Sequence, residues 1–316
     1  PVARAASGGS APRNRRAPAM SPGAASKSEA RGLGLGILGV LGFSLTLPMT
    51  RLAVSELNPI FVSLGRSLIS AALAAGVLLW KRDSFPGARH LPSLLVVALG
   101  VVVGFPVFTT LALREVPASH GAVVTGILPL GTALFGALRA RERPSAGFWL
   151  AASAGTATIV AYVVIQSGLR PTAADMLLVA AVATCSAGYA EGGRLSRELG
   201  GLRVISWALL LASPLLAIPV AVVISVHGEH ASAQAWAAFA YMGVISMFLA
   251  FWAWYEGLAT GGVARVSQVQ LLQPFLTIGA SWLILGERIT PLTIVAALIV
   301  VATVAIGRRA PIARQP

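Results

Sequence analysis

Charged residues are scarce in this chain. Aspartate, glutamate, lysine and arginine make up 11% of its 316 residues, whereas about 25% is typical of a soluble domain. Hydrophobic residues make up 56%, and the mean hydropathy is +0.79. A water-soluble globule cannot bury so large a share of apolar side chains, so we expect an integral membrane protein.

Several functional groups are missing as well. Cys185 is the single cysteine, which excludes an intramolecular disulfide and a cysteine metal site. There is no nucleotide-binding motif, so ATP is not the direct source of energy. The apolar runs contain no HExxH, and His120 has no acid one helical turn away, which argues against an intramembrane enzyme. The run His227-Gly228-Glu229-His230 lacks further ligands, so we predict neither a metal nor another cofactor.

Apolar runs of nearly twenty residues, the length that crosses a bilayer as a helix, occur ten times. Each is bounded by polar or charged residues, and the connections are short. The sequence therefore predicts an all-α membrane protein with ten transmembrane helices. They cover about 32–50, 59–80, 92–113, 118–138, 147–166, 174–190, 204–226, 234–257, 263–284 and 290–307.

The basic residues set the predicted orientation. With the N-terminus in the cytoplasm, nineteen of the 24 lysines and arginines fall in cytoplasmic segments, and Arg66 lies within the second helix. This bias follows the positive-inside rule and predicts that both termini lie in the cytoplasm. The predicted location is the cell (inner or plasma) membrane. The net charge of +13 therefore reflects topology and contact with membrane lipids, and we predict no nucleic-acid partner. The external segments hold Arg51, Arg114, Arg170 and Arg288.

The two ends of the chain are polar. Residues 1–31 are rich in Ala, Ser, Pro, Gly and Arg and contain one acid, Glu29, so we expect a disordered cytoplasmic tail without a classical signal peptide. Translation starting at Met20 is one hypothesis for this segment, and an organelle transit peptide is a less favoured one. Residues 308–316 form a second cytoplasmic tail.

One segment occurs twice. Pro129 precedes Glu142-Arg143 by thirteen residues, and Pro274 precedes Glu287-Arg288 by the same number, with an offset of 145 between the copies. We therefore divide the chain into two units, 32–166 with helices one to five and 167–307 with helices six to ten. Because five is odd, the second unit is inverted in the membrane. We interpret the Glu-Arg pairs as helix-end anchors.

Short motifs within this repeat are similar to those of a known protein family. They are Leu64-Gly65-Arg66, Leu128-Pro129-Leu130, Glu142-Arg143-Pro144-Ser145, Leu272-Gln273-Pro274 and Leu285-Gly286-Glu287-Arg288. With these motifs the chain resembles the EamA-type branch of the drug/metabolite transporter superfamily over about residues 32–307. The resemblance implies a central pathway lined mainly by helices one, three, four, six, eight and nine, with helices five and ten peripheral. The family contains many exporters of amino acids, metabolites and drugs, and also importers.

Polar stripes mark a candidate pathway. Helix nine carries Ser267, Gln270, Gln273, Thr277 and Ser281 on one face. Amides without partners are costly in hydrocarbon, so this face should meet a wet cavity, with helix-to-helix hydrogen bonding as the alternative. Helix four repeats the stripe with Thr125, Pro129, Thr132 and Gly136.

Aromatic side chains supply candidate walls. Trp252 and Tyr255 of helix eight, Phe105 and Phe108 of helix three and Tyr189 of helix six can surround an organic molecule. For Trp252 and Tyr255, an interfacial belt or ordinary packing is the competing interpretation.

Charges and prolines inside the spans complete the candidates. Arg66 should face inward, toward carbonyls, a carboxylate or an anionic group of the substrate, or it bonds loose helix ends. Glu256 is the candidate proton carrier, with simple solvation near its helix end as the alternative. Prolines at 48, 129 and 274 are candidate helix bends, whereas for Pro214 and Pro219 we prefer ordinary tolerance of proline.

The sequence therefore predicts a secondary active transporter that works by alternating access. Its substrate is a small organic metabolite, an amino acid or an amphipathic, drug-like compound, and a proton or substrate gradient drives it. Efflux is preferred on the family resemblance. The alternatives are an importer of the same fold and a lipid-translocating or structural membrane subunit. The oligomeric state stays open.

Overall fold

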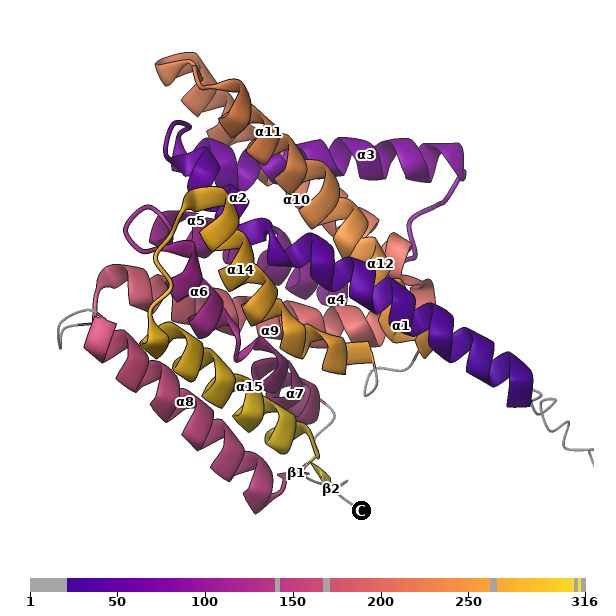
Figure 1. Cartoon of the computed structure of the whole chain (residues 1–316). Coiled ribbons are helices and arrows are strands. Elements are labelled where there is room, and N and C mark those ends of the chain that lie inside the picture. Colours follow the sequence, from indigo (N-terminus) through magenta and orange to yellow (C-terminus); the bar gives the residue numbers. More distant parts are fainter. Residues whose placement is uncertain (1–21, 140–142, 167–170, 262–265, 310–311, 314–316) are drawn as a thin grey trace, which may run out of the picture.

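A computed structural model of the chain describes residues 22–139, 143–166, 171–261, 266–309 and 312–313 (Figure 1). Eight helices are long and apolar enough to cross a membrane, from Ala30–Val54 to Ala233–Gly261. Two shorter apolar helices follow, Val269–Leu285 and Pro291–Gly307. Each of the ten apolar runs in the sequence therefore corresponds to a helical segment, and the chain is a helical, multi-pass membrane protein.

The first half of the chain runs from α1 to α8. Its elements are α1 (Pro22–Ser44), α2 (Thr46–Val54), η1 (Phe61–Gly65), α3 (Arg66–Trp80), η2 (Ala88–His90), α4 (Leu91–Val97), η3 (Ala98–Gly104), α5 (Phe105–Ala112), α6 (Ala118–Thr125), α7 (Leu128–Arg139), β1 (Arg143–Pro144) and α8 (Ala146–Gln166). Helix α1 begins at Pro22, so residues 22–31 are helical where a disordered tail was expected. Met20 and the rest of 1–21 lie outside the described residues.

The second half runs from α9 to β2. Its elements are α9 (Ala173–Leu199), α10 (Gly201–His227), α11 (Ala233–Tyr241), η4 (Met242–Leu249), α12 (Ala250–Gly261), η5 (Ser267–Leu272), α14 (Gln273–Leu285), α15 (Pro291–Arg309) and β2 (Ile312–Ala313). The two-residue strands β1 and β2 pair antiparallel. Segments η1, η3 and η4 are π-helical, whereas η2 and η5 are 3-10 helices.

Prolines coincide with interruptions of the helices. Three residues before Pro48, the chain breaks between α1 and α2, and shortly before Pro129 it breaks between α6 and α7. The 3-10 turn η5 precedes Pro274. Proline has no N–H for the carbonyl four residues earlier, so the helix is weakest at that point. In contrast, α10 stays continuous through Pro214 and Pro219.

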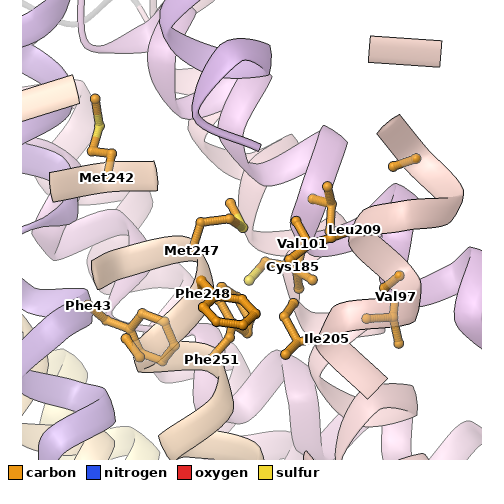
Figure 2. Close-up of a cluster of buried hydrophobic side chains, with 14 of the residues drawn as sticks. Phe43, Val97, Val101, Cys185, Ile205, Leu209, Met242, Met247, Phe248 and Phe251 are labelled. Carbon is orange, nitrogen blue, oxygen red and sulfur yellow. The ribbon is translucent and has the colours of Figure 1, made fainter. Parts of the chain in front are cut away.

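The helices pack around two buried apolar clusters. The larger joins α1, α3, α9, α10 and α12, and Figure 2 shows Phe43, Phe248 and Phe251 of this cluster near Cys185. The smaller joins α6, α8, α14 and α15. Helices α8 and α15 pack against each other at one edge of the molecule, away from α3 and α10 (Figure 1), which is the peripheral place that the resemblance implies for helices five and ten.

Candidate functional site

A cavity of about 380 Å³ lies between α7, α9, α12 and η5. This volume falls in the range of about 300–1,000 Å³ that is usual for small-molecule sites. The end of the cavity at the C-terminal parts of α7 and α9 carries three arginines. The lining residues are Pro129, Thr132, Ala133, Gly136, Arg139, Tyr189, Ala190, Gly193, Arg194, Arg197, Trp254, Leu258 and Gln270.

Local sequence explains why this space stays open. The helix break before Pro129 turns α7 away from the line of α6, and small residues then follow on the cavity side of α7. Gly136 is one of them, and a Cβ atom placed there would meet nothing within 4 Å. A larger side chain at this position would fill the cavity rather than pack against another helix.

Two narrower spaces continue inward from the cavity. One lies at the paired helix breaks, between Thr125, Pro129, Gln270, Pro274 and Thr277, and has a volume of about 10 Å³. The other, of about 20 Å³, extends to α2, α3 and η4. Its lining comprises Phe43, Thr46, Leu47, Arg66, Phe105, Thr125, Leu128, Tyr189, Ser246, Met247, Phe251 and Gln273. Tyr189 belongs to both the cavity and the larger of these spaces, and Gln273 belongs to both spaces.

Polar atoms without partners gather along these spaces. Within the described residues, the Nε2 of Gln270, the Oε1 of Gln273 and the Oγ1 of Thr132 are buried and have no hydrogen-bond partner. A buried polar atom left unsatisfied costs about 1–3 kcal/mol, so such atoms fit a place that receives water or a ligand. Of the stripe on helix nine, Gln270, Gln273 and Thr277 line these spaces, whereas Ser281 lines none of them and donates to the carbonyl oxygen of Thr277. The side chain of Ser267 lies outside the described residues.

The polar residues that the sequence predicts for the pathway meet here. Gln270, Gln273, Thr277, Thr125 and Thr132 all line at least one of the three spaces. The hydroxyl of Thr125 also donates to the carbonyl oxygen of Gly121 in its own helix, at 2.8 Å. The bends at Pro129 and Pro274 both contribute, whereas Pro48 is buried in α2 and lines none of these spaces.

The aromatic predictions need correction. Trp252 has 38% of its surface exposed and lines none of the three spaces, whereas Trp254 lines the cavity. Tyr255 is fully buried where α12 packs on α9, and its hydroxyl donates to the carbonyl oxygen of Gly188 at 3.4 Å. Phe108 lines none of the three spaces. Phe105 and Tyr189 do line them.

At the opposite end of the molecule, Glu287 links the segment after α14 to the start of α6. Its Oε1 accepts a hydrogen bond from the backbone N–H of Ala118 at 2.7 Å, and its Oε2 accepts one from Ser119 at 2.9 Å. Arg51 donates to the carbonyl oxygens of Leu113 and Val116 at 2.6 Å each, and its Nε lies 3.8 Å from Glu287. The carboxylate thereby caps the positive N-terminal end of α6. The side chains of Glu142 and Arg143 lie outside the described residues.

A second link joins the segment after α2 to the segment before α11. The carboxylate of Glu56 accepts hydrogen bonds from the backbone N–H of Ser232 at 2.6 Å and from its hydroxyl at 2.8 Å. These two bonds favour the charged form and lower the pKa of Glu56 below its usual value. The link is therefore complete at pH values above the ordinary glutamate pKa and is lost as the pH falls through the lowered one.

One buried pair has no counterpart in the sequence analysis. The Nε2 of His120 at the start of α6 lies 2.8 Å from Oδ1 of Asp175 at the start of α9, and both side chains are buried. Asp175 also accepts from the N–H and the hydroxyl of Thr172 in a capping box. The Thr172-x-x-Asp175 spacing is a readable helix start, but nothing in the sequence joins it to His120.

Glu256 lies outside the cavity system. Its Oε2 accepts from the backbone N–H of Gly201 at 3.2 Å, at the start of α10. This is the position of a helix-capping carboxylate. Arg66, by contrast, is buried beside the narrower space of about 20 Å³.

Comparison with known proteins gives this architecture a family. The model of the EamA-like transporter family matches residues 30–164 and again 172–307. The chain is 44% identical over 275 residues to the uncharacterized transporter YdeK of Bacillus subtilis (strain 168), covering 87% of this chain and 96% of that protein. It is 26% identical over 287 residues to a probable terminal-alkyne amino-acid exporter of Streptantibioticus cattleyicolor, covering 88% and 94%.

A solved crystal structure has the same fold. It matches with a TM-score of 0.59 at 18% identity and covers 87% of this chain and 97% of the other. At this identity the likeness concerns the fold alone. With the family model matched in both halves, the chain belongs to the EamA-like transporter family and is a membrane transporter of small molecules, not an enzyme.

Proposed function

We propose that the chain forms ten transmembrane helices in two inverted five-helix units, 32–166 and 167–307, with both termini in the cytoplasm. The family model matches nearly the same two segments, and α8 and α15, the last helix of each unit, pack as a pair. The positive-inside rule supports a cytoplasmic position for the end of the cavity that carries Arg139, Arg194 and Arg197.

We further propose that the protein is a secondary active transporter that exports small organic metabolites, amino acids in the first place, by alternating access. The observation that carries this proposal is the cavity between the two units, with the unpartnered amides of Gln270 and Gln273 at its inner end. It is open beside the arginines, while Glu287 and Arg51 close the opposite end. A cavity that faces the cytoplasm suits loading for efflux, and one relative is named an amino-acid exporter.

A proton is the proposed coupling ion, and the His120–Asp175 pair replaces Glu256 as its candidate carrier. The pair lies inside the spans and joins the two units. Around it stand Thr172, which bonds Asp175, and Tyr162, whose ring centroid is 5.1 Å from that of His120. In sealed vesicles, a protonophore should abolish uphill transport. The His120→Gln variant should still exchange substrate across the membrane but should lose uphill transport. Uphill transport that persists with the protonophore would exclude the proton.

Counterflow in liposomes tests the function itself. The purified protein is reconstituted in vesicles loaded with a neutral amino acid, and entry of a radiolabelled trace is measured. We expect saturable counterflow, reduced about tenfold in Gln270→Leu, because about 1.4 kcal/mol per buried hydrogen bond corresponds to tenfold in binding. Gln234→Leu, an exposed glutamine of α11, serves as the matched control and should transport normally.

Three results would contradict this proposal. Absence of saturable counterflow for amino acids and other small metabolites would remove the transport function. Movement of labelled lipid alone would favour the lipid-translocating alternative. Equal counterflow rates in Gln270→Leu and the wild type would mean that the cavity is not part of the transport pathway.

A further inference from the structure

Arg66 is a buried cation that stands apart from the acids of the protein. Only 1% of its surface is exposed, and it lies within the span Phe61–Trp80. No carboxylate of the described residues forms an ion pair with it. A charge buried within a membrane span is costly. Residues that carry this cost usually have a partner or a function.

The contacts of Arg66 leave one complete edge of the guanidinium group free. Its Nη1 is 3.4 Å from the hydroxyl oxygen of Thr50, which is long for a hydrogen bond, and donates to the sulfur of Met242, a weak acceptor, at 3.4 Å. Its Nε and Nη2 have no partner among the described residues. These two nitrogens carry the parallel N–H groups that bind both oxygens of a carboxylate at once.

A purely structural arginine would use these N–H groups to bond loose backbone carbonyls, but serines fill that role here. The hydroxyl of Ser67 donates to the carbonyl oxygen of Val102 at 3.0 Å. The hydroxyl of Ser70 donates to the carbonyl oxygen of Gly243 at 2.5 Å. Two carbonyls near the start of α3 therefore receive their hydrogen bonds from serines, and among the described residues no carbonyl accepts one from Nε or Nη2 of Arg66.

The backbone around Arg66 is irregular on three sides. The π-helical η1 ends at Gly65, directly before it, and η4 begins at Met242, which it contacts. Val102, the partner of Ser67, lies in η3. Segments of π-helix are rare and occur frequently at functional sites. Of the three described π-helical segments, η4 contacts the guanidinium group itself, η1 adjoins Arg66 in the chain, and η3 contacts the neighbouring Ser67.

Arg66 also lies at the end of the route that starts at the cavity. It lines the space of about 20 Å³ together with Tyr189 and Gln273. Tyr189 also lines the large cavity, and Gln273 the space between the helix breaks. The space at Arg66 has room for about one water molecule. A substrate therefore reaches the free edge only when these spaces widen into one.

We propose that Arg66 binds the carboxylate of the transported molecule through Nε and Nη2, in the conformation in which the substrate is enclosed. This inference rests on the proposed transport function and narrows its substrates to small molecules with a free carboxylate, such as zwitterionic amino acids. The aromatic side chains of Phe43, Tyr189 and Phe251, which line the same space, provide an apolar surface for the rest of the molecule. Amides and esters of the same molecules lack the negative charge of the carboxylate, and an amide also lacks its second acceptor oxygen, so both should bind more weakly.

The test compares an acid with its own amide in the counterflow assay, with leucine and leucinamide as the probes. The wild type is expected to be inhibited by leucine at least about tenfold more strongly than by leucinamide, the effect of one charge-assisted contact. Arg66→Gln should lose most leucine counterflow and also this preference, while Arg66→Lys should retain part of both. Lys81→Gln, an exposed cation at the end of α3, is the matched control and should behave as the wild type.

The outcomes separate this inference from the function on which it rests. If the wild type carries no amino acid at all, the proposed function fails. If it carries leucine but is inhibited equally by leucinamide, the function stands and the role of Arg66 in carboxylate binding is overturned, even where an Arg66 variant fails to fold. Counterflow that requires chloride, measured against sulfate buffer, would assign the free edge to an inorganic anion and would likewise overturn the proposal.

Discussion

Replacing Gly257 by valine should prevent α12 from packing against α1 and should abolish recovery of monodisperse protein. A Cβ atom at Gly257 would lie 2.9 Å from the carbonyl oxygen of Gly32 and 2.9 Å from the amide nitrogen of Gly36. Both are backbone atoms, which cannot rotate aside as a flexible side chain can. Overpacking of a core costs about 1–3 kcal/mol where neighbours adjust, and here a whole helix would have to move. Size-exclusion chromatography and thermal unfolding in detergent measure the effect.

Gly34→Val provides the control for this substitution. Gly34 lies on α1, the helix that packs against Gly257 of α12, and a Cβ atom at Gly34 would meet nothing within 4 Å. The control carries the same change in helix propensity and the same added valine in the membrane, without the backbone contact. It should unfold near the wild-type temperature. Equal unfolding temperatures for Gly34→Val and Gly257→Val would mean that α1 and α12 do not approach as closely as the structure has them.

The spans of this protein are readable from its sequence because their signal is local. Hydrocarbon requires about twenty apolar residues in a row, whatever the neighbouring helices are. Proline effects are local too, since the missing N–H acts on a carbonyl one turn away; this gave the breaks before Pro48 and Pro129. The polar face of Gln270 and Gln273 is readable for a similar reason, because amides stand out in an apolar run.

The aromatic wall shows what a local pattern cannot supply. Trp252 and Tyr255 are three residues apart in α12 and therefore lie near one another on one side of that helix. Their spacing does not say whether this side meets the cavity, because that depends on how α12 packs against the other helices. The cavity is lined by Trp254, whereas Trp252 is 38% exposed and Tyr255 is buried. The His120–Asp175 pair was missed for another reason, because it joins helices from different units.

Replacing Glu287 by alanine should shift the protein toward the conformation that is open beside Arg51. The substitution removes two hydrogen bonds to a charged acceptor, from Ala118 and Ser119, each worth about 1.5–3 kcal/mol. These same two bonds form the cap on the N-terminus of α6, so the substitution leaves that helix end uncapped. A net change of about 1.4 kcal/mol already alters the ratio of two conformations tenfold. The shift should therefore be large.

Cysteine labelling in detergent can follow this shift. Cys185 is the single native cysteine, so Cys185→Ala gives a background free of thiols. Leu47→Cys places a thiol at a buried position beneath the closed end, where Leu47 lines the narrow space near Arg66. We expect Glu287→Ala to raise its rate of reaction with a maleimide at least about tenfold, in proportion to the opened fraction. Glu115→Ala removes an exposed acid close to the same end and should leave the rate unchanged.

A second thiol distinguishes alternating access from a simple leak. Thr132→Cys lines the large cavity at the opposite end of the molecule. If the two units rock about the central helix breaks, opening the end beside Arg51 closes this cavity, so Glu287→Ala should slow the labelling of Thr132→Cys while it speeds that of Leu47→Cys. A local loosening would speed the labelling of Leu47→Cys and leave the labelling of Thr132→Cys unchanged. Opposite changes at the two positions would tie Glu287 to the equilibrium between inward-open and outward-open conformations, whereas unchanged labelling at both would mean that Glu287 does not hold the end closed.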